Sequence, residues 1–134
     1  MNKSDSNNLD RLRNLTDKLP LFEDLVSKSG SFTEVETLKG NVFMFGLYNV
    51  PEVNVARVFI SANSEMKIHT HNEFEFMVVY EGKMILTIED KKFDVGVQQS
   101  VYVMPNKPHS AYFPVDTKII SLIIPSSEGY PDAT

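Results

Sequence analysis

Two histidines one residue apart, followed by a glutamate, are the residues of this sequence best suited to chemistry. They lie in the stretch KIHTHNEFEFMVVYEG, which runs from Lys67 to Gly82. Because alternate residues of a strand point to the same face, His69 and His71 can direct both imidazoles into one space. Glu75 shares their parity if the strand resumes after a short turn. Two nitrogens and a carboxylate that converge in this way predict part of a metal site.

The third histidine of the chain supports the same interpretation. His109 follows a proline-rich turn in VYVMPNKPHSAYF and begins a run of strand-forming residues. We therefore expect it at a strand end, near the mouth of a barrel.

Several other polar residues compete for a functional role. Glu73 has the parity of Glu75, but it falls in the expected turn HNEF and is interpreted as solvated surface. Arg57 lies inside an apolar run, so it either faces outward or lines the pocket and holds a substrate carboxylate. Tyr80 and Tyr102 could carry protons if they face inward.

The elements that must position these side chains are strands. From residue 31 to residue 125, short runs rich in Val, Ile, Phe, Thr and Tyr alternate with turn residues, and EDKK at residues 89–92 is expected to be one of these turns. Glu81-Gly82 separates two such runs and predicts a tight hairpin with a positive φ at Gly82. Many short strands without intervening helices predict an all-β sandwich or small barrel.

The ends of the chain have a different character. Leu9, Leu12 and Leu15 recur at helical spacing before Pro20, and a similar pattern continues to Gly30. We therefore expect a helical extension over residues 1–30, with one or two short helices. Residues 126–134 are expected to form an exposed C-terminal tail.

Composition excludes several kinds of site. The 134 residues include no cysteine, so disulfides, thiolate ligands and cysteine nucleophiles are absent. Thirteen basic and eighteen acidic residues give a net charge of −5, which argues against a nucleic-acid partner. No apolar run is long enough to cross a bilayer, and the polar N-terminus lacks a signal-peptide core. A cytoplasmic protein without a membrane partner is the expectation.

The spacing of the histidine stretch resembles the first motif of the cupin family. That motif places His-x-His, a glutamate and a glycine at the intervals seen for His69, His71, Glu75 and Gly82. His109 resembles the histidine of the second motif. The resemblance implies a double-stranded β-helix, a cupin jelly-roll barrel of the RmlC-like kind, over residues 31–125. It also implies that the three histidines and Glu75 bind one divalent metal ion.

The sequence departs from the family pattern at its turns. Asn63 and Asn106 stand where the motifs have glycine, and asparagine tolerates left-handed φ better than most residues. Gln98 replaces another glycine, Met104 a proline and Phe113 an asparagine. These changes affect turn geometry more than they affect the four metal-ligand candidates.

Two functions from different classes are consistent with this pattern. The first is a small metal-dependent enzyme of dioxygenase, isomerase, decarboxylase or lyase type, acting on a small oxygenated organic molecule. The second is a non-catalytic cupin that binds or senses a small ligand. Mixed nitrogen and oxygen ligands suit Fe, Mn, Ni, Zn or Cu and do not select among them. A homodimer is expected, because small cupins commonly pair through their sheets.

Overall fold

A computed structural model describes residues 32–126, which form ten strands and no helix. The strands are β1 (Phe32–Val35), β2 (Val42–Val50), β3 (Val53–Ile60), β4 (Ser64–His69), β5 (Phe74–Glu81), β6 (Met84–Ile88), β7 (Lys91–Val95), β8 (Ser100–Val103), β9 (His109–Phe113) and β10 (Thr117–Ile124). The helices expected in residues 1–30 lie outside the described residues, and so does the expected tail apart from Ser126. The division of the chain into these segments stays a prediction.

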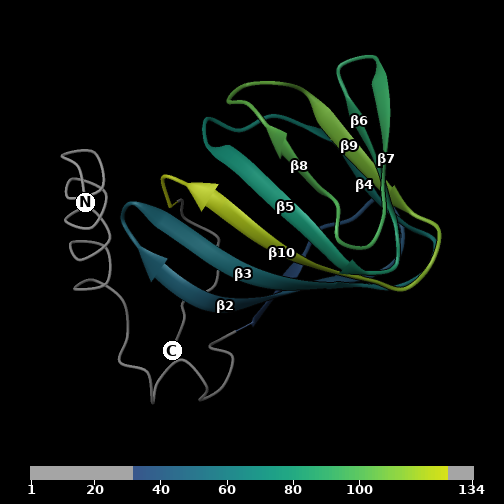
Figure 1. The fold of residues 1–134 in the computed structure, drawn as a ribbon, viewed down its shortest axis with the longest axis horizontal. Coiled ribbons are helices and arrows are strands. Elements are labelled where there is room, and N and C mark those ends of the chain that lie inside the picture. The colour runs from purple at the N-terminus through teal and green to yellow at the C-terminus, as the bar shows by residue number, and fades with distance from the viewer. Residues whose placement is uncertain (1–31, 127–134) are drawn as a thin grey trace, which may run out of the picture.

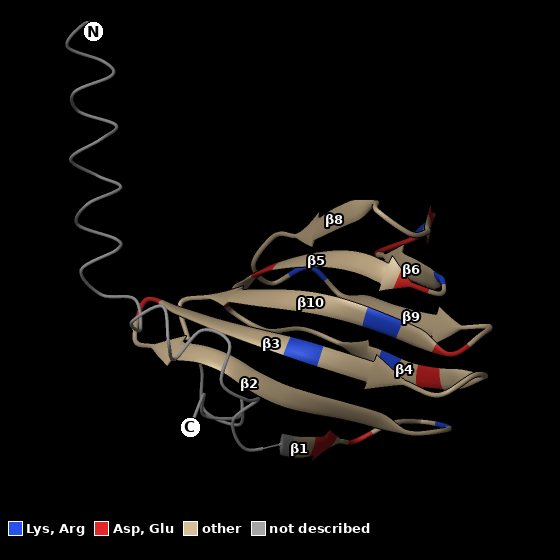
Figure 2. Cartoon of the chain, turned by 60° about the horizontal axis from the view of Figure 1, so that its bottom comes forward, with Lys and Arg blue, Asp and Glu red and all other residues tan. Residues whose placement is uncertain are grey.

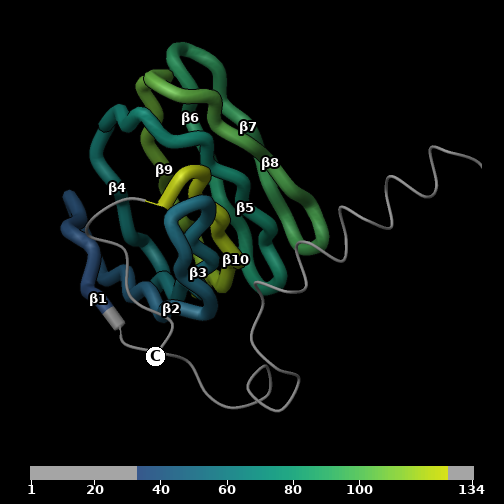
Figure 3. Tube along the Cα trace, turned by 90° about the vertical axis from the view of Figure 1, so that its left-hand side faces the viewer, coloured from purple at the N-terminus to yellow at the C-terminus, as the bar shows by residue number. Residues whose placement is uncertain are grey.

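The strands make two antiparallel sheets that face each other (Figures 1 and 3). One has six strands in the order β1-β2-β3-β10-β5-β8, and the other has four in the order β4-β9-β6-β7. The all-β jelly roll expected from the sequence is confirmed. Within the described range, no helix is long and apolar enough to cross a membrane.

The core lies between the sheets and follows from the alternation along each strand. In β3, every second residue from Asn54 to Ile60 is buried, and β10 repeats this from Thr117 to Ile123. The buried apolar cluster comprises Val42, Val58, Ile60, Met77, Val79, Met84, Leu86, Val95, Val103, Phe113 and Ile119. Period-two burial directs one face of each strand inward, so both sheets contribute to one interior.

The hairpin expected at Glu81-Gly82 is wrong. Strand β5 pairs with β10 and β8, whereas β6 pairs with β7 and β9, so Gly82 lies where the chain crosses between sheets. Its positive φ of 87° is confirmed, and a Cβ there would collide with the backbone around Asp116 and Thr117. The local conformation was predictable, but the partner strand depended on distant residues.

A real hairpin joins β6 and β7 where only a loop was expected. Ile88 pairs with Lys91 across Glu89 and Asp90, and Lys92 is also a strand residue and not a turn residue. Strand β7 is at a sheet edge and four of its five residues are exposed. An exposed edge strand needs little apolar sequence, which is why this one lacked a strand pattern.

Arg57 faces outward. It lies between the buried Ala56 and Val58 and pairs across the sheet with Phe45 and Ile120. Figure 2 shows the basic residues of β3 and β10 on adjacent strands of the six-stranded sheet. Of the two alternatives for Arg57, the structure therefore supports the outer face.

The two candidate tyrosines also lie away from the interior. Tyr80 and Tyr102 are 40% and 57% exposed, and each neighbours an inward-facing valine on its own strand. Neither is placed to carry protons within the barrel.

Candidate metal centre

The site is built where β4 ends and β9 begins. Their pairing sets His69 directly opposite His109, after an irregularity in the ladder. His71 follows in the turn before β5, and Glu75 is the second residue of β5. The Asn106 amide donates to the His71 carbonyl at 2.8 Å, which ties the two turns of the site together.

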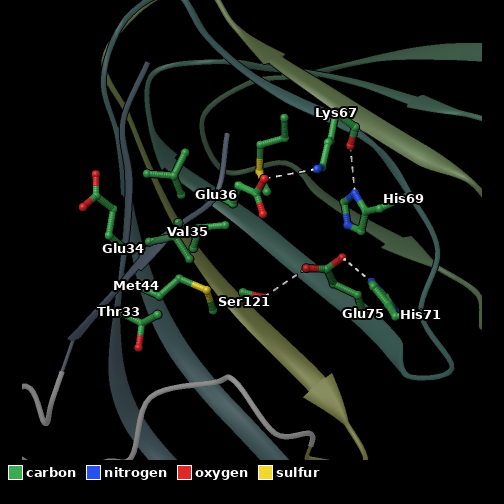
Figure 4. A pocket seen from close by; sticks show the side chains of 13 residues that line it. Thr33, Glu34, Val35, Glu36, Met44, Lys67, His69, His71, Glu75 and Ser121 are labelled. Atoms are coloured by element: carbon green, nitrogen blue, oxygen red, sulfur yellow. Dashed lines mark hydrogen bonds and ion pairs between the residues drawn. The ribbon is translucent and has the colours of Figure 1, made fainter. Parts of the chain in front are cut away.

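The four predicted ligand residues lie together. One ring nitrogen from each of His69, His71 and His109 falls within 4.8 Å of the others. Glu75 Oε1 lies 3.3 Å from His71 Nε2 and 3.5 Å from His109 Nε2. Figure 4 shows Glu75 extending from β5 toward His71, with His69 beside them. Residues distant in sequence thus form one cluster.

Backbone carbonyls fix the orientation of all three imidazoles. The Nδ1 atoms of His69, His71 and His109 lie 3.0, 2.9 and 2.8 Å from the carbonyl oxygens of Lys67, Glu73 and Lys107. A carbonyl can only accept, so each Nδ1 carries the proton. In neutral imidazoles, the Nε2 lone pairs then remain available to the centre of the cluster. Metal-bound histidines are commonly oriented by such outer hydrogen bonds.

One of these nitrogens is buried without a hydrogen-bond partner. His109 is 3% exposed, and its Nε2 makes no hydrogen bond that meets normal geometry. The nearest acceptor is Glu75 Oε1 at 3.5 Å, which cannot satisfy a lone pair. Buried polar atoms in folded proteins nearly always have a partner. A cation among the Nε2 atoms and the carboxylate would satisfy this one, so the donor set fits a divalent metal.

The cluster also perturbs the titration of its members. Burial alone would raise the pKa of Glu75, but the adjacent His109 and His71 side chains outweigh it and lower the pKa to about 2. The hydrogen bond to Glu75 raises the pKa of His71, whereas burial lowers that of His69. Glu75 is therefore a carboxylate at neutral pH, as a ligand must be.

Two further polar side chains support the cluster from outside. Ser121, 3% exposed, donates from Oγ to Glu75 Oε2 at 3.4 Å (Figure 4). The side chain of Glu73 is only 16% exposed, and its Oε2 lies 3.8 Å from His71 Nδ1. The interpretation of Glu73 as solvated surface is wrong, because the turn folds it against His71. It nevertheless lies on the Nδ1 side of that ring, away from the cluster centre.

A pocket of about 460 Å³ opens beside the cluster, at the seam between β1 and β4. Its lining comprises Thr33, Glu34, Val35, Glu36, Val42, Met44, Val58, Met66, Lys67, His69, His71, Glu75 and Ser121. Five of these residues are aliphatic and the others are polar or charged, and Lys67 Nζ pairs with Glu36 Oε1 at 3.3 Å. This volume admits a small organic molecule next to the imidazoles.

Sequence analysis missed some residues of this site. Ser121 had a visible signal, because it is a polar residue at an inward position of the apolar run TKIISLII. Lys67 and Met44 had none, since their roles depend on how β4 meets the β1–β2 edge.

Comparison with protein families gives one match that spans much of the barrel. The family model Cupin_2, described as Cupin domain, matches residues 57–124. The matched region contains the three histidines and Glu75. An uncharacterised protein of Methanocaldococcus jannaschii, MJ1618, is 26% identical over 85 residues. The alignment covers 63% of each protein, so the chain spans less than two thirds of that relative.

Solved structures share the architecture. An RmlC-like cupin from Shewanella frigidimarina superposes with a TM-score of 0.64 and 23% identity, covering 76% of this chain and 95% of that one. A predicted oxalate decarboxylase from Thermotoga maritima gives 0.65 and 19%, covering 75% and 99%. At these identities, the likeness establishes the fold.

Proposed function

Because the chain belongs to the cupin family, we propose that its barrel is a metal-binding enzyme. His69, His71, Glu75 and His109 hold one divalent ion, and the substrate is a small oxygenated organic molecule in the adjacent pocket. The observation that carries the proposal is the buried Nε2 of His109, which has no hydrogen-bond partner and faces Glu75. If His109 only lined the pocket and bound no metal, there would be no reason for the imidazoles of His69 and His71 to be oriented in the same way.

The ion is Fe, Mn, Ni, Zn or Cu, since mixed imidazole and carboxylate ligands suit all of them. When bound, it supplies Lewis acidity or O₂ chemistry at the pocket wall. The protein's own residues fix the donors. Backbone carbonyls orient the imidazoles, Ser121 holds one oxygen of Glu75, and the barrel excludes water from the inner side.

An enzyme of dioxygenase, isomerase, decarboxylase or lyase type is consistent with the pocket. The cluster forms one wall, so a bound organic molecule would contact the ion directly. The Thermotoga neighbour is described as a predicted oxalate decarboxylase, which is one of these reaction types. That likeness is one of fold, so the substrate must be found for this chain by experiment.

The alternative is a non-catalytic cupin that binds or senses a small ligand. This alternative is supported by the pocket lining, which has few side chains that could transfer a proton. Apart from the proposed ligands, the charged residues that line the pocket are Glu34, Glu36 and Lys67. Glu36 and Lys67 pair with each other at the exposed rim, with side chains 83% and 57% exposed. Ligand binding needs no general base, so this pocket would suffice for it.

Metal content tests the first part of the proposal. We expect about one divalent ion per chain in the wild type after dialysis against that metal, and almost none in His71→Ala. Glu81→Gln, on the same strand as Glu75 but at its far end, is the control and should retain the ion. Equal metal content in all three proteins would refute the assignment of ligands.

Turnover separates the two functions. Wild type, Glu75→Gln and Glu81→Gln, each loaded with Fe(II), Mn(II), Ni(II) or Zn(II), are assayed for O₂ uptake and for conversion of small sugars, keto acids and phenols. An enzyme should lose or change its activity in Glu75→Gln and retain it in Glu81→Gln. Saturable ligand binding without turnover by any loaded form would support the sensing cupin.

The expected homodimer also stays a prediction, together with the cytoplasmic location. The outer face of the six-stranded sheet is largely apolar, with Ile120 beside Val78 and Leu122 beside Phe76 in register. A second copy of the chain could cover this face. Light scattering after gel filtration should then give about twice the mass of 15.2 kDa. A monomer at micromolar concentration would contradict the prediction.

A further inference from the structure

The floor of the pocket changes from polar to aliphatic along the six-stranded sheet. Its polar end is Glu75 on β5. Its other end lies over β3, β2 and β1, where Val58 pairs across the sheet with Met44, and Val42 pairs with Val35. Val35 and Met44 lie on the opposite side of the view from Glu75 in Figure 4. A molecule in the pocket would therefore meet polar groups at one end and aliphatic groups at the other.

The rest of the lining has few groups that could hold a ligand hydroxyl. Met66 faces the floor from β4 of the other sheet. Ser121 is already bonded to Glu75. Thr33 is on the edge strand β1, opposite Met44. Between Ser121 and this edge, the floor offers aliphatic side chains alone.

Charge also differs between the two ends. Glu34 and Glu36 lie at the rim, and Lys67 is the one cation among the described residues that line the pocket. Lys67 already pairs with Glu36 at 3.3 Å, so the rim has no cation left for a ligand anion. At the cluster, the single charge of Glu75 would leave a bound divalent ion with excess positive charge. An anionic group is therefore favoured at the cluster and not at the rim.

We propose that the ligand of this pocket is an aliphatic monocarboxylic acid, with its carboxylate at the cluster and its alkyl chain over Val58, Met44 and Val42. The inference rests on the proposed metal site but not on whether the pocket is catalytic. Methylene groups gain free energy when they leave water for the aliphatic end. The hydroxyls of a sugar would lose water there without finding partners. The lining thus selects one class among the oxygenated molecules that the pocket volume admits.

Affinity along a homologous series measures the contribution of the aliphatic end. The full chain loaded with Zn(II) is titrated by calorimetry with lactate, α-hydroxybutyrate, α-hydroxyvalerate and α-hydroxycaproate. Each added methylene should tighten binding about fourfold, which corresponds to about 0.8 kcal/mol. Normal Zn(II) uptake with an affinity that does not rise along the series would overturn this inference and leave the metal assignment intact. Failure to take up Zn(II) would overturn both.

Two further ligands keep the same α-hydroxycarboxylate group and change only the chain. Gluconate has the carbon chain of α-hydroxycaproate with hydroxyls along it, and it should bind at least about tenfold more weakly. α-Hydroxyglutarate adds a second carboxylate to the chain of α-hydroxyvalerate, and it should also bind more weakly because the rim is acidic. If either ligand binds as tightly as its aliphatic counterpart, the inference is overturned.

Variants make the result specific to the aliphatic end. Met44→Gln keeps the length of the side chain but introduces an amide, and Val58→Ala removes two carbon atoms from the same wall. Both should lower the affinity for α-hydroxycaproate several-fold and leave that for lactate unchanged. Met104→Gln is the matched control, because Met104 is 51% exposed and does not line the pocket. A chain-length dependence that persists unchanged in both pocket variants would overturn the inference.

Discussion

The interior between the sheets has a polar end and an apolar end, although the same strands build both. On β5, the inward side chains change from Glu75 to Met77 and Val79. On β9, His109 is at the polar end and Phe113 is at the apolar end. All of these side chains point inward because alternate residues of a strand face the same side. They differ in whether they need polar partners or apolar contacts.

The difference between the two ends shows how the fold separates stability from chemistry. Apolar side chains at one end are satisfied by contact with each other, and their burial stabilises the barrel. At the other end, four polar side chains converge and the Nε2 of His109 lacks a partner. Such an arrangement is costly unless something binds there. Substitutions at the apolar end should therefore change stability, and those at the polar end should change binding.

The largest expected effect is at the apolar end. Phe113→Ala removes a side chain that is 1% exposed and leaves a cavity between the sheets. We expect a loss of about 3–5 kcal/mol in the free energy of unfolding. Urea unfolding of the metal-free protein measures it. A loss below about 1 kcal/mol would show that the interior is not close-packed there.

The second effect is at the polar end and should have the opposite profile. His109→Leu removes a proposed ligand and a buried nitrogen without a partner, while it keeps an apolar group in place. Metal affinity should fall by more than about 100-fold, because losing even an outer-shell partner costs 10–100-fold. The stability of the metal-free protein should change by only about 1 kcal/mol. Titration calorimetry measures the metal affinity and urea unfolding measures the stability. A large loss of stability with intact metal binding would contradict the prediction that the polar end serves binding.

A third prediction concerns acid. The folded pKa of Glu75 is about 2, below its ordinary value of 4.5, so its ionised form stabilises the folded state. In the metal-free protein this contribution is present above about pH 4.5 and is lost as the pH falls toward 2. We expect it to be on the order of 2 kcal/mol and to be absent from Glu75→Gln. Urea midpoints across this range test it, and parallel curves for the two proteins would contradict it.

The smallest effects are expected at two turns, one near each end of the interior. Gln98 and Asn106 have positive φ of 66° and 64°, so glycine should relieve strain at both. We expect stability changes below about 1 kcal/mol in Gln98→Gly and in Asn106→Gly. Both variants should keep the metal affinity of the wild type, because the donor to the His71 carbonyl is the backbone N–H of residue 106, which glycine retains. A fall in metal affinity in Asn106→Gly but not in Gln98→Gly would contradict this and show that the Asn106 side chain itself helps to position the histidine.

Local sequence predicted most of the strands and the conformation of several turns. The apolar runs of β2, β3, β5 and β10 predicted strands, because the alternation that underlies their period-two burial is visible in the sequence. Asn63 and Asn106 were expected to tolerate left-handed φ, and they have φ of 65° and 64°. The edge strand β7 was missed, since a strand exposed on most of its length carries no such pattern.

The sequence by itself determined which residues could meet, and the tertiary structure decided how they meet. Strand parity indicated that His69, His71 and Glu75 could converge, and the resemblance to the two cupin motifs added His109 and implied the full ligand set. Pairing decided the rest, since β5 and β6 are consecutive in sequence yet join different sheets. The burial of His109, the support from Ser121 and the shape of the pocket depend on contacts between distant strands. No local pattern encodes those contacts, because the free energy that selects them comes from packing the whole barrel.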